Sequence, residues 1–262
     1  MKKSILSLLI FTMASMQIVW AQKVLIYKSD DTTVEYETAD IDSMVFVQDE
    51  PVTIPSYVTC PDDNHPHAID LGLPSGTKWC CCNVGASSPE EYGGYYAWGE
   101  TWEKDTYTWK TYTYYKEYPN GTGITKYSLG IYNYAPSFDG KRELDLNDDA
   151  ARVRMGAPWR MPSEEQMREL VDNCSRRGVQ QNGVNSLLMT GPNGSQISLP
   201  LAGRRTDENG NENFINKGYY WTRSLCPGGD GCAVSPRFGS NGSCSWYNDY
   251  RLNVHSIRAV CP

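Results

Sequence analysis

The sequence predicts a mixed α+β protein in which two helices pack on an irregular body rich in strands. Helix-capping residues begin two amphipathic or charged segments, after Asn147 and at Ser163. The rest of the chain from Cys60 to Pro262 has few helix signals and is rich in Gly, Trp and Tyr. After Cys174, short apolar and aromatic runs alternate with turn residues. Helices set apart from a strand-rich body are typical of the α+β class.

Residues 1–21 have the features of a secretory signal. Lys2 and Lys3 provide a basic start, an apolar run follows from Ile5 to about Met13, and the small Ala21 precedes Gln22. We therefore expect export to the periplasm, the cell surface or the medium. The apolar run is shorter than the roughly 20 residues of a spanning helix, and no later stretch approaches that length, so we expect no membrane span.

Two short regions precede the main domain. Residues 22–48 contain alternating apolar positions around Val24, Val34 and residues 44–47, which predict a small β module of two or three strands. Residues 49–59 include Pro51 and Pro55 and are expected to form a linker. The main domain is then 60–262. The net charge of the full chain is −7 and no basic stripe is interleaved with aromatics, so we expect no nucleic-acid partner.

Each predicted helix has its own start signal. Asn147 is the expected N-cap of the first helix, with Asp148 and Asp149 in its first turn, where negative charge suits the positive helix end. Ser163 and Gln166 form a capping box for the second helix. Behind that box, four apolar side chains at helical spacing predict a face turned to the core: Met167, Leu170, Val171 and Cys174.

The strands after Cys174 are predicted from turn chemistry and apolar runs. Asn193 and Gly194 lie between two apolar segments and predict a hairpin with a type I′ turn, which needs positive φ at both residues. Residues 218–222 and 256–260 are expected to be buried strands.

A series of motifs then resembles one known family. They are IDLGLPSGTKW at 69–79, CNVGA at 82–86, YYAWGE at 95–100, DDAA at 148–151, WRMPS at 159–163, LAG at 201–203, YW at 220–221 and RAVCP at 258–262. Their order resembles the family named after the major paralogous domain of Fibrobacter succinogenes, abundant in gut Bacteroidetes. The resemblance implies a C-type-lectin-like fold, related to formylglycine-generating enzymes and to the variable proteins of diversity-generating retroelements. Cys80-Cys81 stands where relatives have Ala-Thr, and Gln166 where they have an acidic residue.

The tail, residues 222–262, has an unusual composition. It contains no Lys, Glu, Gln or Met, although these four types make up 40 of the preceding 221 residues. Retroelement variable proteins, which the tail resembles, are rewritten at the adenines of Asn-type codons, and this rewriting never yields those four residues. The resemblance therefore implies a diversified ligand-binding surface, with Trp246 as a fixed exception. The alternative is an ordinary set of Gly- and Ser-rich loops.

The diversification hypothesis predicts a binding protein with no catalytic residues, whose ligand is an unknown protein or glycan on a cell or phage surface. It also divides the residues of the tail into framework positions and ligand-binding positions. Framework positions are Trp221, Ala233, Phe238, Trp246, Arg251, Ile257, Arg258 and Val260. Positions expected to face outward and bind ligand are Cys226, Pro227, Asp230, Cys232, Val234, Arg237, Asn241, Ser243, Ser245, Tyr247, Asn248, Asp249, Tyr250, Leu252, Asn253 and His255. Tyr247 and Tyr250 are the expected anchors, because paratopes combine rigid aromatics with adaptable polar residues.

Cysteine usage leaves the disulfide pattern open. Nine cysteines in an exported chain favour disulfides, but their connectivity does not follow from sequence. Diversification would explain Cys226, Cys232 and Cys244 without any disulfide role. The chain has no C-x-x-C pair and no His at ligand spacing from a Cys pair, so we expect no zinc and no cofactor.

Three alternatives stay open at this stage. Residues 145–149 alternate oxygen ligands as calcium loops do, but they lack the Gly and distant Glu of an EF-hand, so a helix cap is the favoured interpretation. A formylglycine-generating-type oxidase would need an activated cysteine, and the sequence shows no motif for one. A structural or surface-assembly protein would use an exposed edge strand of the N-terminal module.

Overall fold

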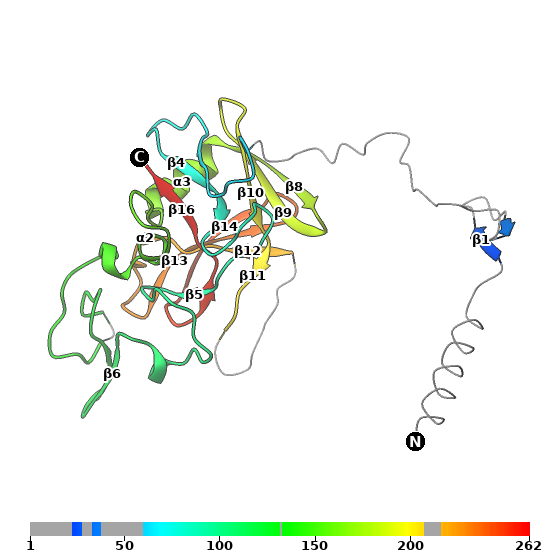
Figure 1. Cartoon of the computed structure of the whole chain (residues 1–262). Helices are drawn as coiled ribbons and strands as arrows, with labels where there is room; N and C mark the ends of the chain where they lie inside the picture. Colours follow the sequence, from blue (N-terminus) through cyan, green and yellow to red (C-terminus); the bar gives the residue numbers. More distant parts are fainter. Residues whose placement is uncertain (1–22, 28–32, 38–59, 132, 207–215) are drawn as a thin grey trace, which may run out of the picture. The chain divides into compact units, whose positions relative to one another are not determined.

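The computed structural model describes residues 23–27, 33–37, 60–131, 133–206 and 216–262 (Figure 1). The chain divides into two compact units, Met1–Thr53 and Ile54–Pro262. In the first unit, β1 (Lys23–Tyr27) pairs antiparallel with β2 (Thr33–Glu37), which confirms two of the predicted strands. The expected signal, the strand at 44–47 and the linker lie outside the described residues.

A three-stranded sheet in the second unit pairs the last strand of the chain with two strands from near the start of the unit. β4 (Lys78–Asn83) pairs antiparallel with β3 (Ala68–Asp70) on one side and with β16 (Arg258–Cys261) on the other. Figure 1 shows the last strand, in red, beside the cyan β4. The buried C-terminal strand predicted at 256–260 is therefore confirmed, although its ladder begins at Arg258.

The described residues contain two α-helices, as predicted. α2 (Ala150–Met155) begins two residues later than expected, because Asp149 and not Asn147 is its N-cap; the Asp149 carboxylate accepts from the Arg152 amide at 3.0 Å. Asn147 lies in the preceding 3-10 turn η3 (Leu146–Asp148). α3 (Glu164–Asn173) has the predicted capping box, and the four predicted core side chains of its apolar face are buried.

Two hairpins follow α3. β8 (Ser175–Gln181) and β9 (Val184–Thr190) are joined by Asn182-Gly183, both at positive φ, as a type I′ turn requires. β10 (Gln196–Pro200) pairs with β9, which confirms the second hairpin. Its turn is not type I′, since only Gly194 has positive φ and the loop spans 191–195.

The tail forms most of a second sheet in the order β11-β12-β13-β14. Its strands are β11 (Ala202–Gly203), β12 (Lys217–Tyr219), β13 (Cys232–Gly239) and β14 (Cys244–Tyr250). β15 (Val254–His255) then pairs with β5 (Tyr96–Ala97). A separate ribbon contains β6 (Tyr115–Tyr118) and β7 (Gly121–Ile124), preceded by the short turn η2 (Trp109–Thr111).

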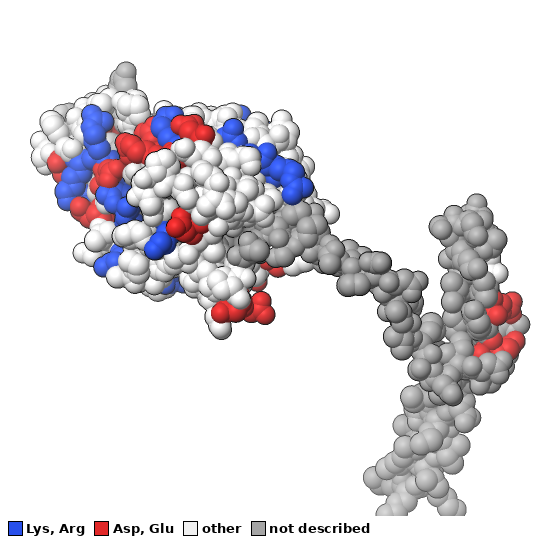
Figure 2. All heavy atoms as spheres, turned by 90° about the horizontal axis from the view of Figure 1, so that it is seen from above, with Lys and Arg blue, Asp and Glu red and all other residues white. Residues whose placement is uncertain are grey.

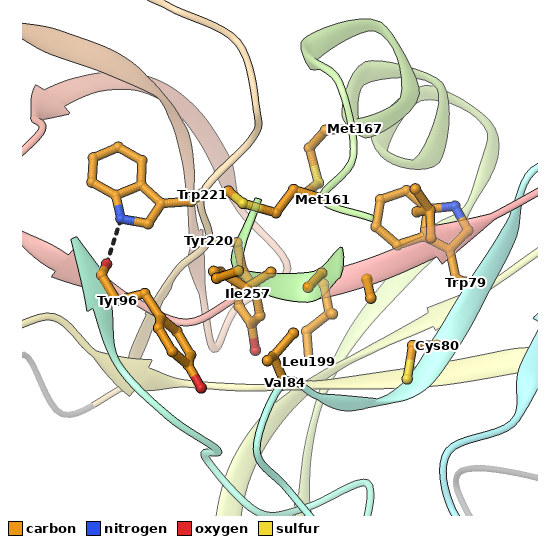
Figure 3. Close-up of a cluster of buried hydrophobic side chains, with 14 of the residues drawn as sticks. Trp79, Cys80, Val84, Tyr96, Met161, Met167, Leu199, Tyr220, Trp221 and Ile257 are labelled. Carbon is orange, nitrogen blue, oxygen red and sulfur yellow. Dashed lines mark hydrogen bonds between the residues drawn. The ribbon is translucent and has the colours of Figure 1, made fainter. Parts of the chain in front are cut away.

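The core is rich in aromatic side chains (Figure 3). Trp79, Tyr220 and Trp221 are completely buried, and the indole N–H of Trp221 donates to the carbonyl of Tyr96 at 2.8 Å. Met161 and Met167 close the cluster from the helical side. The described chain is therefore the mixed, strand-rich α+β body that the sequence predicts. Among its helices, none has the length and apolar character needed to cross a membrane.

Candidate ligand-binding surface

The exposed part of the tail is centred on β14. Among the described strands, β14 pairs only with β13 and therefore forms an edge of its sheet. Ser245, Tyr247, Asn248 and Tyr250 are exposed along it, and Tyr250 is 62% exposed. Such an edge strand presents aromatic rings and hydrogen-bonding groups together, as binding surfaces do.

Two loops of the tail, before β13 and between β13 and β14, also have exposed residues. Asn241 and Ser243 are exposed in the turn that joins β13 to β14, and Pro227 is exposed in the loop before β13. Cys232 and Arg237 are half-buried. We define the exposed tail set as the seven predicted binding residues that are exposed: Pro227, Asn241, Ser243, Ser245, Tyr247, Asn248 and Tyr250.

Seven other predicted binding residues do not face outward. Their side chains are buried, so the prediction that they are exposed is wrong. We define them as the buried tail set: Cys226, Asp230, Val234, Asp249, Leu252, Asn253 and His255. By contrast, the eight predicted framework residues are buried except Trp246, which is half-buried against the Arg168 guanidinium at 3.9 Å.

A buried carboxylate fixes the end of β14. Asp249 accepts hydrogen bonds from the Asn253 amide at 2.7 Å and from His255 Nε2 at 2.9 Å. It also pairs with the guanidinium of Arg204. Burial opposes ionisation, but the hydrogen bond from His255 and the charge of Arg204 lower the pKa of Asp249 to about 2. The acidic side chain is buried because partners satisfy it.

His255 continues this network into the core. Burial lowers its pKa, so the imidazole is neutral at pH 7, with Nε2–H donating to Asp249 and Nδ1 accepting from Ser235 Oγ at 2.8 Å. The ring stacks on Trp221 at 3.9 Å between centroids. Ser235, His255 and Asp249 resemble a catalytic triad in their order of hydrogen bonds. However, Ser235 and His255 are completely buried, so the hydroxyl is inaccessible to substrate and the network is structural.

A second buried carboxylate attaches the tail to the segment after β7. Asp230 accepts from the backbone amides of Leu129 and Gly130, at 2.8 and 3.0 Å, and from the Asn133 side chain at 2.9 Å. Together with a hydrogen bond from the Ser128 hydroxyl, these hydrogen bonds outweigh the opposing effect of burial and lower the pKa of Asp230. A residue predicted to contact ligand instead positions the loop beneath the surface.

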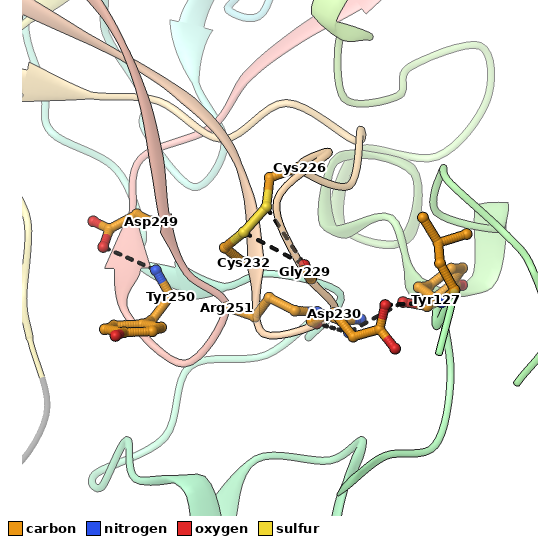
Figure 4. Close-up of a disulfide and its surroundings, with 9 residues drawn as sticks. Tyr127, Cys226, Gly229, Asp230, Cys232, Asp249, Tyr250 and Arg251 are labelled. Atoms are coloured by element: carbon orange, nitrogen blue, oxygen red, sulfur yellow. Dashed lines mark hydrogen bonds between the residues drawn. A yellow bond between two sulfur atoms is a disulfide. The ribbon is translucent and has the colours of Figure 1, made fainter. Parts of the chain in front are cut away.

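Arg251 also attaches the tail to the segment after β7. Its completely buried guanidinium donates to the carbonyls of Asp230 and Lys126, at 2.9 and 3.1 Å, and lies over the Trp98 ring at 4.4 Å. In Figure 4 the Arg251 side chain extends towards Asp230, whereas the ring of Tyr250 points away from them. Of these two adjacent residues of the tail, Arg251 therefore packs in the core, whereas Tyr250 lies on the surface.

The tail also contains a disulfide. Cys226 and Cys232 are joined across five intervening residues, with 5.6 Å between their Cα atoms (Figure 4). The expectation that all three tail cysteines lack a disulfide role is wrong for these two. Cys244 is free and half-buried, and burial raises the pKa of its thiol. The raised pKa of Cys244 is the opposite of what an oxidase cysteine needs.

A pocket adjoins Tyr250, and sequence reasoning missed it. Its volume is about 170 Å³, and its lining includes Trp109, Tyr115, Ile124 and Gly231. The Trp109 ring meets the Tyr250 ring edge to face at 6.1 Å between centroids. Trp109 and Tyr115, in the aromatic-rich run 107–115, were the available signal, because Trp and Tyr are enriched at binding hot spots.

Tyr247 is linked to the buried network through one arginine. The Arg204 guanidinium lies 5.6 Å from the centroid of the Tyr247 ring and also pairs with Asp249. Arg237 approaches the same ring at 6.0 Å. Tyr247 is 39% exposed, so it is held on one side and open on the other, as expected of an anchor.

The carboxylates at 145–149 have protein partners. Asp145 pairs with Lys126 and Lys141, and Asp148 pairs with Lys126. Asp149 accepts from backbone amides at the start of α2 and at Met161. Ammonium groups and amides thus occupy these oxygens, which favours the helix-cap interpretation over a calcium loop. On the face in Figure 2, basic and acidic side chains are interspersed.

The chain was compared with family models, with curated proteins and with solved structures, and it matches none of them.

Proposed function

We propose that this chain is an exported ligand-binding protein with a C-type-lectin-like fold, and that the exposed tail set forms its binding surface. The observation that supports this most directly is the row of exposed Tyr, Asn and Ser side chains on the edge strand β14. Behind the row, the Asp249 and Arg251 contacts hold the backbone rigidly. A rigid support lowers the entropy cost of binding.

The proposed ligand is a protein or glycan on a cell or phage surface. Tyr247 and Tyr250 supply stacking surfaces, and the pocket beside Trp109 offers a recess for a small group such as a sugar ring or an apolar side chain. Asn248 and the serines supply adaptable hydrogen bonds. On the face in Figure 2, acidic and basic side chains are mixed and form no basic stripe of the kind that nucleic acid would need.

Diversification is the second part of the proposal. The tail lacks Lys, Glu, Gln and Met, four of the five residue types that adenine rewriting cannot produce, and the fifth, Trp, occurs once, at the framework position Trp246. The framework residues are buried or half-buried. We propose that rewriting acts on the exposed tail set, where exchange changes the ligand without disturbing the core. The codons of the seven positions test this. Codons unrelated to AAY by adenine changes would contradict it.

Binding is tested by screening the full chain against surface glycans and proteins of host cells, phages and bacteria. The triple variant Tyr247→Ala, Asn248→Ala, Tyr250→Ala should lose at least about 100-fold in affinity, since central aromatic anchors dominate interfaces. Trp102→Ala is the control, because Trp102 is an aromatic residue outside the tail and is about as exposed as Tyr250. Unchanged binding by the triple variant would contradict the proposed surface.

Attachment to a larger assembly is a second candidate role, for the first unit. Within its described residues, β1 and β2 form a two-stranded ribbon, and Thr33, Glu35 and Glu37 of β2 are exposed. A strand at the edge of a sheet can pair with a strand of another protein. Deleting residues 22–59 should then abolish retention at the cell surface while ligand binding persists. Retention without these residues would contradict this role.

A further inference from the structure

Four metal-ligating side chains meet where the described part of the second unit begins. The ligand atoms of Cys60, His65, His67 and Cys81 all lie within 4.8 Å of one another. Cys81 is buried and the other three are half-buried. They meet because β3 pairs antiparallel with β4, and just before β3 the Cys81 amide donates to the His67 carbonyl at 3.0 Å.

The distances within the cluster suit a tetrahedral ion. Cys81 Sγ lies 3.2 Å from His65 Nδ1 and 3.8 Å from His67 Nδ1. Across a tetrahedral zinc ion, a nitrogen and a sulfur ligand are separated by about 3.6 Å. The two imidazole rings are nearly perpendicular, with centroids 5.0 Å apart, so both can direct a nitrogen to one point. We propose that Cys60, His65, His67 and Cys81 bind a structural Zn²⁺ ion.

Neighbouring groups orient these ligands. His67 Nε2 lies 3.1 Å from the Asp62 carboxylate, so its Nε2–H donates there and its Nδ1 lone pair is left for the metal. The His67 backbone amide donates to Cys81 Sγ at 3.0 Å. A carboxylate behind a ligating histidine and an amide on a thiolate are the outer contacts expected at a metal site.

The chemistry of the donors favours zinc over calcium or magnesium. Thiolate and imidazole are ligands for zinc, whereas hard ions take oxygen. Binding releases the thiol protons of Cys60 and Cys81 to solvent, and two thiolates then balance the 2+ charge.

The position of the site indicates a structural role. An open pocket lined by Cys60, Asp62, His65 and Glu90 gives an ion access to the cluster. All four positions are taken by protein ligands, which is typical of structural zinc. The ion would hold Cys60, the first described residue of this unit, against the central strand β4.

The full chain, purified without chelator, tests this by metal analysis and by cobalt substitution. We expect one zinc per chain, and a visible absorption spectrum of tetrahedral, thiolate-bound Co²⁺ after exchange. A Cys60–Cys81 disulfide in the purified protein, with no metal uptake after its reduction, would overturn the proposal.

Two matched pairs of variants identify the ligands. Asp62→Asn should weaken zinc binding by about 10–100-fold, because it removes the charge behind His67; Asp63→Asn, at the exposed neighbouring position, should leave it unchanged. Cys81→Ser should abolish the cobalt spectrum, and Cys244→Ser should not. Because Asp62 is exposed, its variant should fold even if Cys81→Ser does not. Equal affinity of the two aspartate variants would contradict the site.

Discussion

Strand β14 and the segment that follows it differ in burial although both contain polar side chains. β14 is mostly exposed, whereas every residue from Arg251 to Cys261 is buried. Both contain Arg, Asn, Ser or Asp side chains that composition alone would place in solvent. The difference lies in partners: Asn253 and His255 bond to Asp249, and Arg258 donates to backbone carbonyls. Polarity therefore does not predict exposure where hydrogen bonds are complete.

The largest effect should come from Arg251→Ala. It removes a buried guanidinium from Trp98 and leaves the carbonyls of Lys126 and Asp230 without their donors. We expect a loss of about 3–5 kcal/mol in the free energy of unfolding, measured by denaturant titration. Arg237→Ala, in the half-buried position of β13, should cost less than about 1 kcal/mol. Equal losses of stability in the two variants would contradict the distinction between the buried framework residue Arg251 and the half-buried Arg237.

Loss of the disulfide should have a smaller effect. Replacing Cys226 and Cys232 with Ala opens a short loop, which should cost about 2 kcal/mol of stability. Reductant should lower the stability of the wild type to that of the variant and leave the variant unchanged. A wild type insensitive to reductant would show that these cysteines do not stabilise the tail.

Acid should weaken the buried network. The pKa of His255 is lowered in the folded state, so the unfolded chain binds more protons below about pH 6.5 and stability falls on acidification. Between pH 7 and pH 5 this costs up to about 2 kcal/mol. Asp249, with a pKa of about 2, adds a loss only below about pH 4.

Comparison with His255→Gln isolates this histidine from other titrating groups, since Gln does not titrate. The wild type should lose more stability than the variant between pH 7 and pH 5, in denaturant titrations at both values. Parallel pH profiles would show that His255 is not the titrating group.

The smallest effect on stability should come from Tyr247→Ala. The ring is partly exposed and contacts Arg204 at 5.6 Å, so truncation should cost less than about 1 kcal/mol. The same variant should lose most of the ligand affinity. A large loss of stability, measured by thermal unfolding, would contradict this and show that Tyr247 packs as a framework residue.

The features that the sequence predicted correctly are those that depend on residues close together in the chain. The capping box of Ser163 and Gln166, the hairpin at 191–195 and the two helices follow from local chemistry. Burial of Asp230 or His255 depends on partners about 100 and 20 residues away, Leu129 and Ser235, that no local pattern indicates.

Two cysteine features also could not be predicted from the sequence, each for its own reason. The cluster of Cys60, His65, His67 and Cys81 forms because the ladder between β3 and β4 brings Cys81 to the two histidines. The Cys226–Cys232 disulfide was hidden for another reason, because the composition of the tail explained its cysteines without one.

The most direct test of the account is a pair of display libraries. One randomises the exposed tail set and the other randomises the buried tail set, and both are scored for protease resistance and for ligand binding. The account predicts that most variants of the exposed library stay folded but lose or change the ligand, whereas few variants of the buried library fold. Similar folded fractions in the two libraries, or unchanged ligand binding throughout the exposed library, would contradict it.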